Sequence, residues 1–112
     1  GGQVVGGPSQ AIEDGGEVQA DGYRWSQTEE EVEMKFSVAQ GTKAKYVKVN
    51  FGRKSLKVTA AGQTLVHGET GGEVAVDECT YTIQDDREGG RELCVTLGKK
   101  GDVMWGYAVL PK

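Results

Sequence analysis

The sequence has no long hydrophobic run, and it contains only two cysteines, one histidine and two prolines. No apolar stretch approaches the roughly 20 residues that cross a bilayer, and no basic region followed by an apolar one marks a signal peptide. The single histidine, His67, has no serine or cysteine motif near it. No EF-hand, P-loop or zinc-ligand spacing occurs either. We therefore expect no enzyme activity, no cofactor and no bound metal.

The two cysteines fall in runs where apolar and polar residues alternate. Cys79 is in phase with the apolar residues of its run, whereas Cys94 is out of phase with those of its own. If both runs are strands of one sheet, the two thiols point to opposite faces, while a disulfide needs Cβ atoms about 3.8 Å apart. We expect two free thiols and a reducing compartment, the cytoplasm.

At 112 residues, with 37% hydrophobic residues, the chain predicts one domain with a modest core. Residues 1–22 are rich in glycine and show no periodicity. Such a segment has too little apolar surface to offset the entropy lost on ordering. It is predicted to be a flexible leader, and the folded domain is expected over residues 23–112.

Alternation with a period of two is the main structural signal in residues 23–112. The run EVEMKFSV, residues 31–38, alternates apolar with polar residues, and successive strand side chains point to opposite faces. This outweighs the capping-box signature Thr28-x-x-Glu31, which taken alone would begin a helix. The expected strands are residues 31–38, 46–51, 56–60, 63–67 with Leu65 as the apolar member, 74–76, 79–83, 93–97 and 104–110.

Turn residues separate these short strands about every 8–12 residues, a spacing typical of all-β sandwiches and barrels. We predict an all-β fold, a seven- or eight-stranded antiparallel β-sandwich, because each strand carries one polar face and two sheets packed together leave both outer faces wet.

The hairpin formed by residues 44–60 collects positive charge. Between Gln40 and Gly68 there are six basic and no acidic residues, in a chain of net charge −4. Such a patch would attract an acidic protein surface. Alternatively, these lysines form a solvated face that protects a sheet edge against aggregation. Nucleic acid is not expected as a partner, because the overall charge is negative and paired surface aromatics are missing. The predicted partner-binding cations are Lys45, Lys48, Arg53, Lys54 and Lys57.

An ordered set of motifs resembles the CS domain, which co-chaperones of the ninety-kilodalton heat-shock protein share with the NudC nuclear-movement proteins. The resemblance implies a sandwich like that of small heat-shock proteins and a binding role without catalysis. Within this family, the sequence is most similar to the NudC branch. The resemblance implies that the partner is the heat-shock chaperone or its clients, dynein-pathway proteins included. The motifs are Tyr23-x-Trp25-x-Gln27, EVEMKFSV, Leu65-Val66-His67-Gly68-Glu69, residues 74–85 (VAVDECTYTIQD), residues 93–99 (LCVTLGK) and Trp105.

The aromatic residues of these motifs allow two interpretations. In the first interpretation, the only two tryptophans, Trp25 and Trp105, fill the core, because tryptophan buries a large area. In the second they are exposed anchors, since aromatic residues concentrate at interface hot spots. Tyr23 and Trp105 are included in the predicted partner-binding site.

Two functions remain open from the sequence. A co-chaperone would dock acidic or amphipathic partners as a monomer, and salt would weaken that docking. A holdase of small heat-shock type would instead cover apolar client segments, as large oligomers and independently of salt. The monomer is favoured because Pro111 and Lys112 form no alternating apolar tail that links subunits.

Overall fold

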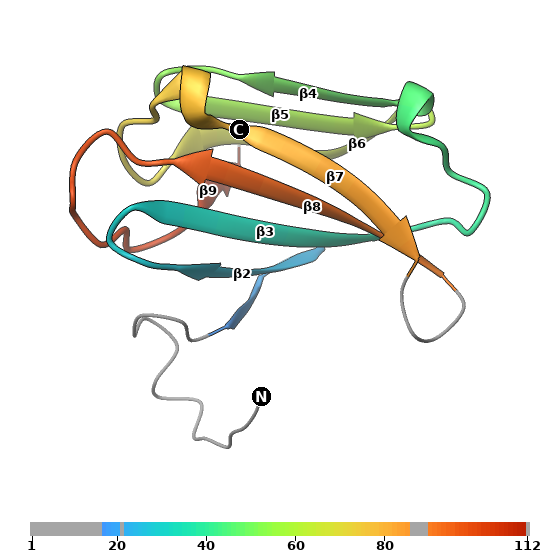
Figure 1. Cartoon of the computed structure of the whole chain (residues 1–112), viewed down its shortest axis with the longest axis horizontal. Coiled ribbons are helices and arrows are strands. Elements are labelled where there is room, and N and C mark those ends of the chain that lie inside the picture. The colour runs from blue at the N-terminus through green and yellow to red at the C-terminus, as the bar shows by residue number, and fades with distance from the viewer. Residues whose placement is uncertain (1–16, 21, 86–89, 112) are drawn as a thin grey trace.

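Two antiparallel sheets packed face to face form the protein (Figure 1). The structure, a computed structural model, describes residues 17–20, 22–85 and 90–111. One sheet has the strand order β1-β2-β3-β8-β7, and the other has the order β4-β5-β6-β9. The predicted all-β sandwich is confirmed. Its elements are β1 (Val18–Ala20), β2 (Tyr23–Gln27), β3 (Glu31–Val38), the 3-10 helix η2 (Ala44–Tyr46), β4 (Val47–Phe51), β5 (Ser55–Ala60), β6 (Gln63–Thr70), the 3-10 helix η3 (Val76–Glu78), β7 (Thr80–Asp85), β8 (Arg91–Gly98) and β9 (Val109–Pro111).

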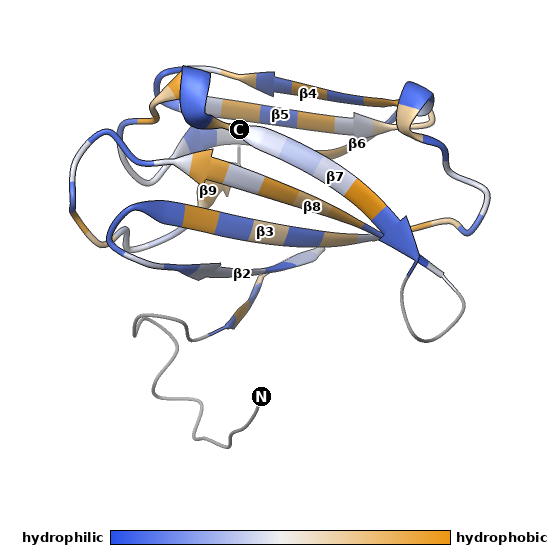
Figure 2. Cartoon of the chain, in the orientation of Figure 1, coloured by the Kyte–Doolittle hydropathy of each residue, from blue (hydrophilic) through white to orange (hydrophobic). Residues whose placement is uncertain are grey.

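The core lies between the sheets and is built from alternate residues of the central strands. Figure 2 shows the resulting bands of apolar and polar residues along β3 and β8, which pair antiparallel over their whole length. Each aliphatic or aromatic side chain buried in this way contributes about 1.5–3 kcal/mol relative to an exposed one. The period-two prediction is therefore confirmed at its strongest strands. The largest fully buried apolar residues are Val32, Met34, Phe36, Leu56, Val58, Val74, Leu93, Val95 and Leu97.

The capping-box signature at Thr28 closes a tight turn between β2 and β3. The N–H of Thr28 donates to the carbonyl oxygen of Glu31 at 2.9 Å. The hydroxyl of Thr28 accepts hydrogen bonds from the N–H groups of Glu30 and Glu31, at 3.2 and 3.1 Å. The local signal for a helix start is thus satisfied by a turn, because the strand pairing of β3 dominates.

The short strand β1 lies in the segment predicted to be a flexible leader. Val18, Gln19 and Ala20 pair with Trp25, Arg24 and Tyr23 of β2, so main-chain pairing orders a stretch whose composition predicts no structure. Residues 1–16 and position 21 of the predicted leader lie outside the described residues.

Three details of the expected strands are corrected. The last predicted strand, residues 104–110, is a loop up to Ala108, and only β9 pairs with β6. The run at Val74–Val76 ends in η3, and Val74 makes only an isolated bridge to Lys99.

The third detail concerns Leu65, the predicted apolar member of its strand, which is only partly buried against the core. The register between β5 and β6 shifts after Val58, which pairs with Val66, whereas Thr59 pairs with Thr64. Leu65 is therefore the extra residue of a β-bulge, and Val66 is buried in its place.

A buried polar network fastens the loop of residues 99–108 to the end of β2. The side-chain amide of Gln27 donates to the carbonyl oxygen of Trp105 at 2.9 Å, and its Oε1 accepts from the N–H of Trp105 at 2.8 Å. Lys99 Nζ donates to the same Oε1 at 2.8 Å and to the carbonyl oxygens of Thr28 and Val103 at 2.6 and 2.8 Å. These contacts hold the Trp105 side chain in the core.

Gly72 provides the space for that tryptophan. A Cβ atom at Gly72 would lie 2.3 Å from Nε1 of Trp105, far inside van der Waals contact. The loop of residues 99–108 therefore approaches Gly71 and Gly72 so closely that neither position has room for a side chain.

Replacement of Gln27 tests this network. Gln27→Ala removes both hydrogen bonds to Trp105 and leaves buried main-chain groups unsatisfied, so we expect the free energy of unfolding to fall by about 3 kcal/mol. Chemical denaturation followed by tryptophan fluorescence measures it. The control is Gln63→Ala, an exposed glutamine of β6, which should change stability by no more than about 0.5 kcal/mol. Equal effects of the two substitutions would show that the network is not stabilising.

Candidate functional site

The outer face of the sheet β4-β5-β6 carries the predicted hairpin cations. Lys48 of β4 is directly opposite Thr59 of β5, and Lys57 of β5 is opposite Asn50 on one side and His67 on the other. Directly opposed residues of antiparallel strands have Cβ atoms about 5 Å apart on one face. Lys48 and Lys57 therefore occupy one continuous face, as the alternation predicted, and His67 is an exposed neighbour of Lys57.

Two hollows lie along this hairpin. The larger, about 340 Å³, is lined by Lys45, Tyr46, Lys48 and Thr59 together with the turn at Ala61-Gly62. The smaller, about 220 Å³, includes Asn50, Lys57 and His67 in its lining and lies toward the Gly52 turn.

Tyr46 is a surface residue that was not among the predicted partner-binding residues. Its side chain is 52% exposed, and Lys45 Nζ lies 5.2 Å from the centroid of its ring. An exposed tyrosine beside lysines combines apolar contact area with a hydroxyl, which suits a protein interface. The signal was present in the sequence, because Tyr46 is out of phase with the inward-facing Val47.

The turn cations differ from those on the sheet face, because the fold brings carboxylates to them. Arg53 forms an ion pair with Glu73, and Lys54 Nζ lies 3.6 Å from a carboxylate oxygen of Glu69. Both pairs are largely exposed, so each contributes little stability, but each reduces the local positive charge. The stretch without acidic residues in the sequence is therefore not free of acidic neighbours in space.

The cations at Lys45, Lys48 and Lys57 make no ion pair with any residue that the structure describes. We call these three lysines together with Tyr46 the sheet-face cluster; Lys48 and Lys57 lie on the strands, and Lys45 and Tyr46 lie in η2, which leads into β4. Their charge remains available to an external partner.

The outer face of the other sheet is different in its charge balance. There Arg24 forms ion pairs with Glu92 and Glu17. Arg24 is therefore compensated within the fold, whereas Lys35 of β3, on the same face, makes no ion pair with a described residue. Of the two sheet faces, the sheet-face cluster thus provides the more suitable site for a negatively charged partner.

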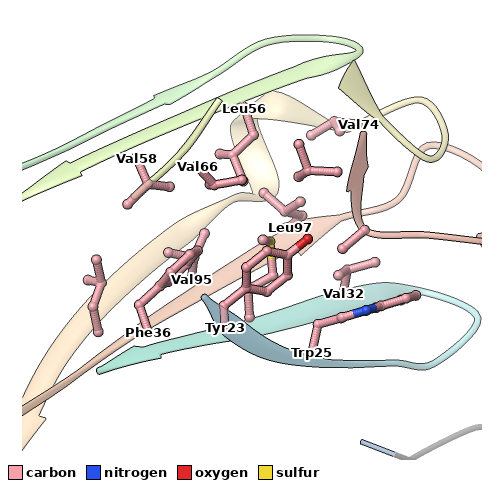
Figure 3. Packing of buried hydrophobic residues seen from close by; sticks show 14 of the residues in the cluster. Tyr23, Trp25, Val32, Phe36, Leu56, Val58, Val66, Val74, Val95 and Leu97 are labelled. Atoms are coloured by element: carbon pink, nitrogen blue, oxygen red, sulfur yellow. The ribbon is translucent and has the colours of Figure 1, made fainter. Parts of the chain in front are cut away.

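Tyr23 and Trp105, which were predicted to contact a partner, lie in the core. Their side chains are 7% and 4% exposed, and Trp25 is similarly buried. Figure 3 shows Tyr23 and Trp25 projecting from β2 between the sheets, and the Tyr23 ring centroid is 5.2 Å from that of Phe36. The interpretation of these aromatics as core residues is correct, because positions 23, 25 and 27 share the inward face of β2.

Both cysteines are free, as expected. Their side chains are half-buried. Burial raises the pKa of both thiols; Glu92 and Glu33 raise that of Cys94 further, while a backbone hydrogen bond from Gly98 partly offsets the rise at Cys79. A raised pKa keeps a thiol protonated and therefore a poor nucleophile at neutral pH.

Within the described ranges, no three ligating side chains are grouped so that they could hold a metal ion. In the same residues, no helix is long and apolar enough to cross a membrane.

Comparisons with known proteins find relatives for most of the chain. The family model of the CS domain matches residues 21–99. The nuclear migration protein nudC of Drosophila melanogaster is 38% identical over 88 residues, which are 76% of this chain and 25% of that protein. Protein BOBBER 2 of Arabidopsis thaliana is 32% identical over 84 residues, 74% of this chain and 27% of that protein. The chain thus spans about a quarter of the length of these curated relatives.

A solved structure shows the same fold. The nuclear movement protein from E. cuniculi GB-M1 superimposes with a TM-score of 0.68 at 23% sequence identity, covering 80% of this chain and all of that one.

Alkylation kinetics test the state of the two thiols. Because their pKa values are raised and both side chains are half-buried, we expect iodoacetamide to modify Cys79 and Cys94 at neutral pH more slowly than in the urea-unfolded chain. The rates should keep rising above about pH 8.5, the ordinary thiol pKa. Mass spectrometry of quenched samples measures both rates. A rate plateau below pH 8.5 would mean that either thiol is acidified instead.

Proposed function

The chain belongs to the CS domain family, and on that premise we propose that it is a non-catalytic protein-binding module acting as a co-chaperone of NudC type. Its partner is the ninety-kilodalton heat-shock chaperone, or client proteins of that chaperone, including those linked to dynein and nuclear movement. It works as a monomer in the cytoplasm.

The sheet-face cluster carries this proposal. Lys45, Lys48 and Lys57 are cations without ion-pair partners among the described residues, in a chain whose net charge is −4. A rigid face of this kind attracts an acidic surface, raises the association rate and excludes basic partners by repulsion. Binding then stabilises whichever partner conformation presents the matching acidic surface, which requires no chemistry from this chain.

An independent holdase is the second candidate function, favoured by exposed apolar side chains near the end of the described chain. Val103, Tyr107 and Leu110 are 65%, 40% and 53% exposed, and such side chains can hold unfolded segments by apolar contact. Apolar contact is not weakened by moderate salt, whereas docking by the lysines is. Salt dependence of partner binding therefore separates the two functions.

A double charge reversal tests the co-chaperone proposal. Lys48→Glu combined with Lys57→Glu should leave the fold intact, because both side chains face outward, and should weaken binding to the nucleotide-bound ninety-kilodalton chaperone at least about tenfold. Isothermal titration calorimetry measures the affinity, and circular dichroism checks the fold.

The matched control makes the same change in net charge at two lysines outside the sheet-face cluster. Lys35→Glu with Lys100→Glu places two reversals outside the sheet-face cluster, on β3 and in the loop after β8. This control should bind the chaperone as the unaltered chain does. Equal losses in both double variants would reveal a general charge effect, and undiminished binding of the first variant would refute docking through the cluster.

A further inference from the structure

β4 forms one edge of its sheet, and its main-chain groups divide into two sets. The carbonyl oxygen of Tyr46 accepts from the N–H of Ala61, and the N–H of Gly52 donates to the carbonyl oxygen of Ser55, both at 2.9 Å. Both contacts point toward β5. Because the direction of hydrogen bonding alternates along an antiparallel strand, the even-numbered residues of β4 face β5. The N–H and C=O groups of Val47, Val49 and Phe51 therefore face the open edge.

The side chains of β4 alternate in the same rhythm. Val47 is buried, while Val49 and Phe51 are only partly buried against the core. Lys48 and Asn50 lie on the outer face and are exposed. A strand added beside β4 would thus meet half-covered apolar side chains on its inner face and, on its outer face, Lys48, with Lys57 one strand further on.

The other edges lack this combination. β1 and β9 are only three residues long, and the exposed residues of β7 include Thr80, Thr82 and Gln84 but no cation. Figure 1 shows β4 along the border of the sandwich, with no neighbouring strand beyond it. Among the four edge strands in the described part of the chain, β4 alone combines an open main chain of more than three residues with an exposed lysine, Lys48, that has no ion pair with a described residue.

We propose that the open edge of β4 binds an extended polypeptide segment in which acidic and apolar residues alternate. Main-chain hydrogen bonds to Val47, Val49 and Phe51 provide the attachment, as in other cases of strand addition to a sheet edge. The apolar residues pack beside Val49 and Phe51, and the acidic ones lie beside Lys48 and its neighbours in the sheet-face cluster. This inference rests on the proposed function, because it uses the same lysines.

Edge lysines also prevent aggregation, and the two roles are compatible. A second copy of β4 would bring its own Lys48 toward this face and be repelled. An acidic strand meets no such repulsion, so the lysines that discourage self-pairing select for an acidic partner.

Synthetic peptides test the edge. The probe is a heptapeptide in which glutamate and isoleucine alternate, and its control has the same composition in two blocks. Alternation places all carboxylates on one face of the added strand, so we expect the alternating peptide to bind at least about tenfold more tightly in NMR titrations of the whole chain. Shifts should concentrate at Val47, Val49 and Phe51. Equal affinities of the two peptides would overturn the inference.

N-methylation of the alternating peptide provides a second readout. Methylating either all isoleucine amides or all glutamate amides blocks one edge of the peptide, and only one edge can face β4. Unequal losses, about tenfold apart, support edge pairing, and equal effects refute it.

The experiments distinguish a failure of the proposed function from a failure of strand addition at β4. If Lys48→Glu with Lys57→Glu leaves chaperone binding unchanged, docking through the cluster is wrong, while the peptide comparisons still decide the edge. If that variant loses the chaperone but the two peptides bind equally, docking stands and strand addition is refuted.

Discussion

The rest of the fold depends on the way Gln27 is bound to the main chain of Trp105. A side-chain amide that satisfies both the N–H and the C=O of one residue acts as a substitute for a strand neighbour. It allows a loop, which has no sheet partner of its own there, to close the end of the sandwich without leaving buried main-chain groups unsatisfied. Lys99 strengthens this closure by donating to the same amide oxygen and to two main-chain carbonyls. Three separated motifs of the CS-domain resemblance thus meet in one structural contact.

This contact explains why the motif residues lie apart from the residues that we propose bind a partner. Tyr23, Trp25 and Trp105 are buried in the core, and the main chain of Trp105 also closes its end. The surface that we propose for a partner is the outer face of β4 and β5, which the core does not constrain. Relatives with the same motifs can therefore share the sandwich while differing in what the outer face binds.

The two outer faces of the sandwich differ in how their positive charges are compensated. On the face of β2, β3 and β8, Arg24 is paired with the carboxylates of Glu92 on β8 and of Glu17 just before β1. On the face of β4 and β5, the lysines have threonine, asparagine and histidine as cross-strand neighbours. The acidic excess of the chain lies elsewhere, so the molecule is electrically asymmetric despite its modest net charge.

The sequence by itself determined the strands with strong period-two alternation, the hairpin of β4 and β5 and the outward direction of Lys48 and Lys57, because these follow from neighbours along the chain. Only the tertiary structure decided which cations lie beside a carboxylate, since Glu69 and Glu73 approach the turn through β6 and the loop after it. It also decided that Leu65 is displaced by a bulge and that the segment before Val109 forms a loop. Those outcomes depend on register and on contacts such as Gln27 with Trp105, which join residues far apart in the sequence and leave no local pattern.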